Sequence, residues 1–162
     1  WSLKMLERAA RGDAEGLYRA HWLLTDSLEM LTEEKIGRVG TLKCELPLVE
    51  FLPFVIKSLG CHGLRYVSCG KDVHRVAVGG GACGEYEAAA LAAGCDTFVT
   101  SDLKYNQFLD APGKGINLID AGHFPTENVV CEELVRRLSE AFPTIQITKS
   151  AVHHDAVQFY MS

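Results

Sequence analysis

His123 and Glu127 are the residues whose types and spacing point most directly to chemistry. They lie four positions apart, after the run 116–119, which is typical of a buried strand, and at the start of a segment with helical periodicity. Side chains at positions i and i+4 are neighbours on a helix surface, so an imidazole and a carboxylate there can bind one cation. Metal sites usually need three or four protein donors, so this pair is part of a site at most.

A second polar group follows the strand that we expect at Thr97–Thr100. Asp102 could cap the next helix or serve as a carboxylate of a site. If this strand and the strand expected at Asn117–Asp120 are parallel, their carboxyl ends open at one edge of the sheet, where ligands of α/β proteins bind. The sequence therefore makes Asp102 a candidate pocket residue beside His123.

The run Gly79–Gly84 matches the GxGxxG pattern of dinucleotide-binding proteins, with Asp102 lying 18 residues after Gly84. In that pattern the glycines let the backbone approach a pyrophosphate at a helix N-terminus. Glu85 and Glu87 in the first turn of the expected helix Glu85–Ala93 would repel such an anion. The alternative is a tight turn between a strand and a helix.

His153, His154 and Asp155 form the other dense cluster of metal-binding residue types. Adjacent residues of an extended segment point to opposite faces, so both histidines would not reach one ion unless the backbone turns. We expect a solvated loop here. The six cysteines are scattered without a CxxC pair, which favours buried thiols over a zinc site or a disulfide framework.

The arrangement of the expected elements predicts an α/β fold, a layered domain with a central mixed sheet flanked by helices, over residues 36–162. Residues 1–35 are expected to form a helical hairpin that precedes it, with helices at Ser2–Ala10 and Ala14–Leu31. A loop with Gly37 and Gly40 and a helix from Pro47 to Leu59 follow. Val129, Val130, Leu134, Leu138 and Ala141 or Phe142 give the helix after His123 an apolar face. Strands are expected at Leu64–Ser68, Arg75–Val78, Thr97–Thr100, Asn117–Asp120, Thr144–Thr148 and Val157–Tyr160.

Composition narrows the classes of protein. With 162 residues, 48% of them hydrophobic, the chain is long enough for about one domain with a core. The net charge of −5 and the lack of a basic cluster beyond Arg136 and Arg137 do not suit a nucleic-acid binder. No apolar stretch approaches a membrane span of about 18–20 residues, and no signal peptide is visible, so we expect a soluble, cytoplasmic protein. The start at Trp1 rather than Met leads us to expect that part of the native protein is missing.

Four segments together resemble the C-terminal half of the GTP cyclohydrolase I type 2 homolog family, also called the Ngg-interacting-factor-three-like family. The resemblance extends over about residues 37–162, and its most specific element is the fourth segment. The segments are GRVGTL (37–42), RVAVGGGACG (75–84), FVTSDLKYN (98–106) and LIDAGHFPTE (118–127).

The resemblance implies a dinuclear site for divalent metal ions, zinc, iron or manganese, between two similar α/β halves of a ring-shaped homo-oligomer, usually a hexamer. It makes His123 and Glu127 the metal ligands of the C-terminal half, and Asp102 a pocket residue or an orienting group. The remaining ligands of the family lie in an N-terminal half that this chain does not contain. Ser101 and Asn106 depart from the family's Thr-Gly-Asp-x-x-x-His segment, which bears on the surroundings of the site and on substrate contacts.

Three hypotheses of function follow. The first is a metal-binding protein, a divalent-metal-dependent hydrolase acting on a nucleotide-like substrate, with half of the metal site in this chain. The second is a non-catalytic scaffold or regulatory module that assembles with itself or a partner. The third is dinucleotide binding at Gly79–Gly84.

Overall fold

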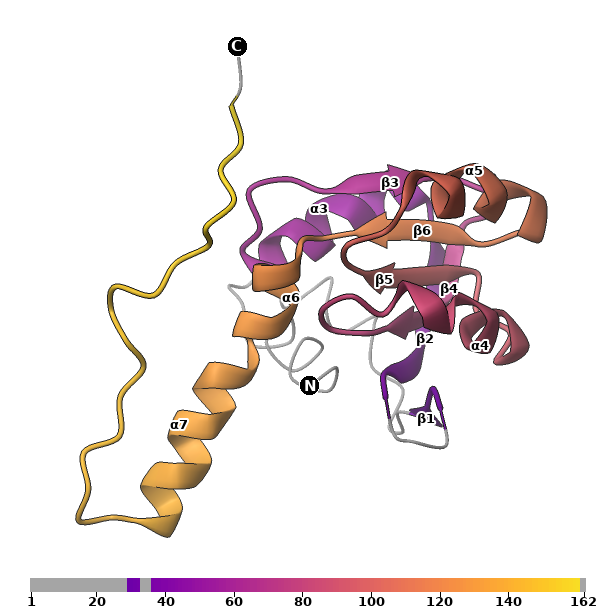
Figure 1. Cartoon of the computed structure of the whole chain (residues 1–162). Helices are drawn as coiled ribbons and strands as arrows, with labels where there is room; N and C mark the ends of the chain where they lie inside the picture. The colour runs from indigo at the N-terminus through magenta and orange to yellow at the C-terminus, as the bar shows by residue number, and fades with distance from the viewer. Residues whose placement is uncertain (1–28, 33–35, 161–162) are drawn as a thin grey trace.

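A computed structural model describes residues 29–32 and 36–160, which build a mixed sheet with helices on both faces (Figure 1). Six strands of this part of the chain lie in the order β1-β2-β4-β5-β6-β3. β4, β5 and β6 are parallel, and the β1–β2, β2–β4 and β3–β6 pairs are antiparallel. The fold class predicted from the sequence is confirmed. The strands are β1 (Glu29–Met30), β2 (Arg38–Leu46), β3 (Arg65–Val67), β4 (Val73–Val78), β5 (Thr97–Thr100) and β6 (Asn117–Asp120).

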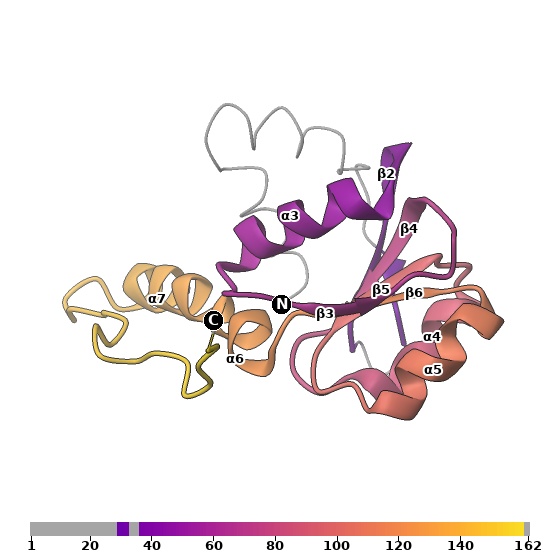
Figure 2. The same cartoon turned by 90° about the horizontal axis from the view of Figure 1, so that it is seen from above.

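The helices form two layers around the sheet (Figure 2). α3 covers one face, and α4 and α5 cover the other. Within the described ranges, no helix is long and apolar enough to cross a membrane. The helices are α3 (Leu48–Leu59), the 3-10 helix η1 (Gly84–Tyr86), α4 (Glu87–Ala92), α5 (Tyr105–Lys114), α6 (His123–Asn128) and α7 (Val130–Ala141).

Successive residues of the central strands belong to two different cores. Val99 and Ile119 pack in the core that includes α3, whereas Phe98 and Leu118 pack in the core that includes residues of α4 and α5. All four side chains are buried. Because successive side chains of a strand point to opposite faces, β5 and β6 are covered on both sides and held firmly in place.

The carboxyl ends of β5 and β6 lie side by side. Thr100 pairs with Asp120 in the parallel register, and the Ala121 amide donates a hydrogen bond to the Thr100 carbonyl at 2.9 Å. The loops that follow the two strands therefore open at the same edge of the sheet, as expected for parallel neighbours. These loops carry Asp102 and His123.

The prediction of a loop around Gly37 and Gly40 is wrong, because residues from Arg38 onward form β2. Gly40 pairs with Val76 inside the antiparallel β2–β4 ladder, and Val39 is buried. Glycine weakens a strand locally, but pairing with a central strand and burial of the alternate side chains outweigh that preference here.

The two strands predicted near the C-terminus are also wrong. Residues 144–148 and 157–160 contain no strand, and no described strand pairs with them. Their β-branched and aromatic side chains match the composition of a strand, but a strand also needs a neighbour to complete its backbone hydrogen bonds.

The predicted N-terminal hairpin lies largely in residues 1–28, outside the described residues. Its last part is described, and there the prediction is wrong. Glu29 and Met30 form β1, paired with Val39 and Arg38 of β2, rather than the end of a helix.

The helix predicted after His123 forms in two parts, α6 and α7, joined at Val129. Val129 is buried in the core around α3, but α7 extends away from the sheet (Figure 1). Leu134, Leu138 and Phe142 on its expected apolar face are exposed. The site-bearing start of this helical region is therefore anchored in the domain, whereas its far end projects from it.

All six cysteines are free thiols, but they are not uniformly buried as predicted. Cys61 and Cys95 are buried, whereas Cys44 on β2 is exposed. Burial disfavours the charged thiolate and raises the pKa of Cys95 to about 11.

We expect iodoacetamide at pH 8 to label Cys44 rapidly and Cys95 only after unfolding, because the thiolate is the reactive form and Cys95 holds its proton. Peptide mass mapping of the labelled native chain checks this. Cys44→Ser should remove the fast site, and Cys95→Ser should leave native labelling unchanged. Equal labelling rates at the two positions would contradict the burial of Cys95.

Candidate functional site

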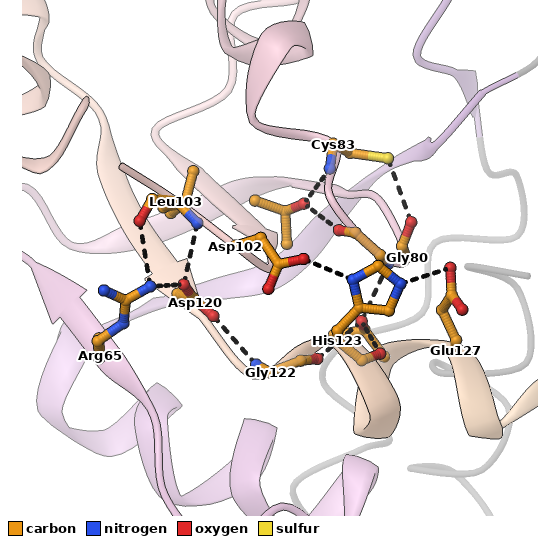
Figure 3. Close-up of polar contacts among 12 residues, drawn as sticks. Arg65, Gly80, Cys83, Asp102, Leu103, Asp120, Gly122, His123 and Glu127 are labelled. Atoms are coloured by element: carbon orange, nitrogen blue, oxygen red, sulfur yellow. Dashed lines mark hydrogen bonds and ion pairs between the residues drawn. The ribbon is translucent and has the colours of Figure 1, made fainter. Parts of the chain in front are cut away.

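Asp102, His123 and Glu127 meet at the carboxyl edge of the sheet (Figure 3). The Asp102 carboxylate lies 2.5 Å from Nδ1 of His123, and Oε1 of Glu127 lies 3.3 Å from Nε2 of the same ring. The three side chains are each about half exposed, at 52%, 50% and 46%. The imidazole is thus oriented from both sides and accessible to solvent.

Asp102 has an unusual backbone conformation. Its φ of 54° lies in the left-handed region, which non-glycine residues rarely adopt and aspartate tolerates better than most. This conformation costs about 1–2 kcal/mol and persists where surrounding contacts hold it. Asp102 lies in the loop between β5 and α5, and its side chain reaches the helix that follows β6.

The buried Asp120 carboxylate joins the two loops (Figure 3). Its Oδ2 accepts a hydrogen bond from the Leu103 amide at 3.0 Å, and its Oδ1 accepts one from the Gly122 amide at 3.1 Å. Arg65 of β3 pairs with Oδ2 and donates to the Leu103 carbonyl at 3.1 Å. Sequence reasoning missed Asp120 as a structural centre, although an aspartate that ends an apolar strand before a glycine turn is a usable signal.

The turn at Gly81 and the helix α6 are fitted to each other. The Gly81 amide donates to Thr126 Oγ1 at 3.0 Å, and the buried Thr126 hydroxyl lies 2.9 Å from the Gly122 carbonyl. Gly81 has a φ of +71°, and a Cβ there would collide with the Glu127 carboxylate and approach His123. Glycine adopts this positive φ without strain and has no Cβ, so Gly81 lets the turn approach the His123 and Glu127 side chains closely.

This arrangement argues against a pyrophosphate in the Gly79–Gly84 turn. The Gly81 amide is bonded to Thr126, and the Cys83 amide is bonded to Thr100 Oγ1 and to the Gly81 carbonyl. A phosphate-binding turn needs amides directed at the ligand. Glu127 also places a carboxylate against this turn, where an anion would be repelled. The geometry favours the tight-turn interpretation.

The surroundings of His123 raise its pKa. The main cause is the hydrogen bond with Asp102, opposed by desolvation and supported by the negative charges of Glu127 and Asp102. The carboxylate that accepts from Nδ1–H also makes the opposite nitrogen a better electron donor. Nε2 is the nitrogen that faces Glu127 and solvent, so His123 is prepared to bind an electrophile through Nε2.

The geometry of the pair fits a divalent metal ion. Nitrogen and oxygen ligands at about 2.0–2.2 Å from a tetrahedral ion lie about 3.4 Å apart. The 3.3 Å between Nε2 of His123 and Oε1 of Glu127 is compatible with this separation, and in the metal-free chain the same contact is an ion pair with the protonated imidazole. A carboxylate on the other nitrogen of a metal-binding histidine is the usual supporting arrangement, and Asp102 provides it.

The described residues supply two such donors and no more at this position. No group of three or more His, Cys, Asp or Glu side chains within 29–32 and 36–160 is arranged to hold a metal ion. His153 instead contacts the ring of Phe124, with centroids 4.9 Å apart, and Nδ1 of His154 lies 2.8 Å from the Val152 carbonyl. The C-terminal histidines therefore do not complete the site.

The structure also shows where Ser101 and Asn106, the two departures from the family's sequence pattern, are located. Ser101 is fully buried, its amide donates to the Gly81 carbonyl at 3.2 Å, and its hydroxyl has no hydrogen-bond partner within the structure described. Asn106 is exposed on α5. Neither residue contributes to the Asp102, His123 and Glu127 group.

The substitution Gly81→Ala should destabilise the protein more than Gly70→Ala. Both glycines have positive φ, +71° and +83°, but a Cβ at position 70 meets no atom within 4 Å. The shared backbone strain costs about 1–2 kcal/mol, and at position 81 the half-exposed Glu127 side chain must also turn away, which adds roughly 0.5–1.5 kcal/mol. Urea unfolding of both variants measures the difference, and equal losses would show that Gly81 has no role in close packing.

Comparison with known proteins agrees with the motifs and the fold. The family described as Duf34/NIF3 (NGG1p interacting factor 3) matches residues 5–156. Among curated proteins, a GTP cyclohydrolase 1 type 2 homolog of Bacillus subtilis is 40% identical over 108 residues, which cover 66% of this chain and 29% of that protein. One of Nostoc is 36% identical over 105 residues, covering 63% and 40%. The chain thus spans less than half the length of these relatives.

Solved structures give the same result. Staphylococcus aureus protein SA1388 superimposes with a TM-score of 0.70 and 29% identity, over 76% of this chain and 42% of that one. A Bacillus cereus protein related to NIF3 superimposes with a TM-score of 0.65 and 32% identity, over 76% and 36%. The resemblance found in four segments is confirmed, and the family match begins well before them. Since it covers nearly all of the sequence, the chain belongs to the Duf34/NIF3 family.

Proposed function

We propose that this chain carries part of a divalent-metal site, in which Nε2 of His123 and the Glu127 carboxylate are ligands and Asp102 orients His123. The single observation that supports this most is the continuous line of contacts from Asp102 through the imidazole to Glu127. An imidazole and a carboxylate together suit zinc, iron and manganese. The complete site would hold two ions.

We further propose metal-dependent hydrolysis of a nucleotide-like substrate. A bound divalent ion would polarise a substrate oxygen and lower the pKa of a water molecule. The residues of this chain have their own tasks. Asp102 accepts the Nδ1–H bond and keeps Nε2 directed outward, Gly81 leaves room for the Glu127 carboxylate, and Thr126 fixes the turn against α6. The curated relatives are named GTP cyclohydrolase 1 type 2 homologs, which agrees with a hydrolase that acts on a nucleotide-like substrate.

The remaining ligands are proposed to come from elsewhere. Two donors bind a divalent ion weakly, and tight sites use three or four. This chain spans 29% to 40% of the two curated relatives, so the rest of such a protein, or another subunit of a ring-shaped homo-oligomer such as a hexamer, would complete the site. The exposed apolar residues of α7 agree with a surface that is covered in an assembly.

A scaffold or regulatory module without catalysis is the second candidate. It is supported by the count of donors, since the described residues place only His123 and Glu127 in position to bind a metal. The same fold would then serve assembly, with the residue pair kept as a surface contact. Metal titration separates the two candidates.

We expect His123→Ala to weaken Zn²⁺ and Mn²⁺ binding by at least about tenfold, because even the loss of a supporting residue costs 10–100-fold. Isothermal titration calorimetry of the metal-stripped chain measures this. His154→Ala is the matched control, since His154 is exposed and lies outside the site. Absence of specific binding, or equal effects of the two substitutions, would favour the scaffold.

Asp102→Asn should weaken metal binding by about 10–100-fold while leaving both ligands in place. It should also lower the pKa of His123 in the metal-free chain, because the hydrogen bond with Asp102 is the main cause of its elevation. Proton NMR titration of the imidazole measures the second effect. Asp110→Asn, an exposed change on α5, serves as the control. An unchanged His123 pKa in Asp102→Asn would exclude the orienting role.

A further inference from the structure

A cavity of about 230 Å³ adjoins the His123 and Asp102 side chains. One wall comes from Leu64 and from Arg65 at the start of β3, and a second from the start of α6, at Phe124. The third wall is the C-terminal segment, through Asp155 and Phe159. Segments far apart in the sequence thus enclose a space beside the candidate metal ligands.

The size of this cavity limits its ligand. A cavity of about 150 Å³ admits benzene, and pockets for drug-sized molecules begin at about 300 Å³. The value here lies between them. The space therefore suits a molecule, or part of a molecule, of one or two rings rather than an entire nucleotide.

The lining selects the chemistry of that ring. The side chains of Leu64, Phe124 and Phe159 provide an apolar surface for a flat molecule. Asp102 and Asp155 line the cavity with hydrogen-bond acceptors, and Asp155 uses only Oδ1 in its turn with the Val157 amide. A ring with N–H donors can satisfy these carboxylates.

The balance of charge disfavours an anionic ligand. Arg65 is the guanidinium in the lining, and its charge is paired with Asp120 and placed over the Phe108 ring, 5.3 Å from the centroid. Three aspartates, at 102, 120 and 155, line the same cavity, and His123, its other basic side chain, is paired with Asp102. A neutral or cationic donor therefore fits better than a carboxylate or a phosphate.

The C-terminal wall contacts the domain through side chains and not through backbone pairing, and its Phe159 side chain is 53% exposed. Among the described residues, no backbone–backbone hydrogen bond joins 146–160 to the rest of the domain. The wall is held instead by contacts such as the His153 ring on Phe124, next in sequence to His123. A ligand between Phe124 and Phe159 would add contacts to a segment that the backbone leaves loosely attached.

We propose that this cavity is the binding site of a flat nitrogen heterocycle with N–H donors, and that residues 155–159 are its specificity-determining wall. The inference rests on the proposed function in one respect, which is that the ring would present its reactive substituent to the metal site at His123. A nucleobase belongs to this chemical class, so the cavity would take the base portion of a nucleotide-like substrate.

The probe for this site is 2-aminobenzimidazole, a two-ring molecule with N–H donors. It is titrated into the metal-stripped, ¹⁵N-labelled chain and followed by amide chemical shifts. We expect saturable shifts at Gly63, Gly122 and Phe159. Phe159→Ala should raise the dissociation constant about fivefold, in line with the loss of one aromatic contact. Tyr160→Ala, at a side chain that is 96% exposed and outside the lining, should change it less than twofold.

Two further arms make the result decisive. Benzofuran has the same fused six- and five-membered rings but neither the ring N–H nor the amino group, and it should bind at least about fivefold more weakly, as should 2-aminobenzimidazole to Asp155→Asn. No saturable shift at these amides, equal affinity for Phe159→Ala, or equal affinity for benzofuran overturns the inference. The probe is measured without metal and the metal without probe, so failure of the cavity and failure of the metal site give separate signals.

Discussion

The buried carboxylate of Asp120 is the interaction on which the rest of the site depends. It accepts hydrogen bonds from the amides of Leu103 and Gly122 and pairs with Arg65, so one side chain ties β3 and the loops after β5 and β6 together. A buried charge is tolerated only when its partners are in place, so these three bonds are mutually dependent. Because Leu103 follows Asp102 and Gly122 precedes His123, these bonds fix the backbone position of both site residues.

A second connection completes the edge of the sheet. The turn after β4 meets α6 through the Gly81 amide and Thr126, and the absence of a side chain at Gly81 leaves space for Glu127. The segments that follow the three adjacent parallel strands β4, β5 and β6 thus contribute to one site at the edge of the sheet. The strands are covered on both faces, and the side chains of the site are exposed to solvent. Such an arrangement would give the metal ion proposed above rigid first contacts while leaving access to it.

Sequence patterns predicted the elements that local physical chemistry controls. The bounds of β5 and β6 follow from apolar runs that end in polar residues, and the His123 and Glu127 spacing places both side chains on one helix face. The wrong predictions concern segments whose secondary structure depends on residues that are distant in sequence. β2 forms through Gly40 because β4 lies beside it, and residues 144–148 and 157–160 stay irregular without a described strand to pair with. Asp120 was missed because two of its three partners, Leu103 and Arg65, are remote in sequence.

The sequence by itself determined the fold class, the family and the candidate ligand pair, because periodicity, motif order and i, i+4 spacing are local properties. Only the tertiary structure decided that Asp102 orients His123, that Gly81 must lack a side chain and that the C-terminal segment walls a cavity. The physical reason is that each of these depends on atoms brought together by strand pairing and buried hydrogen bonds. Oδ2 of Asp102 and Nδ1 of His123 lie 2.5 Å apart, and no pattern in the residues between them predicts that contact.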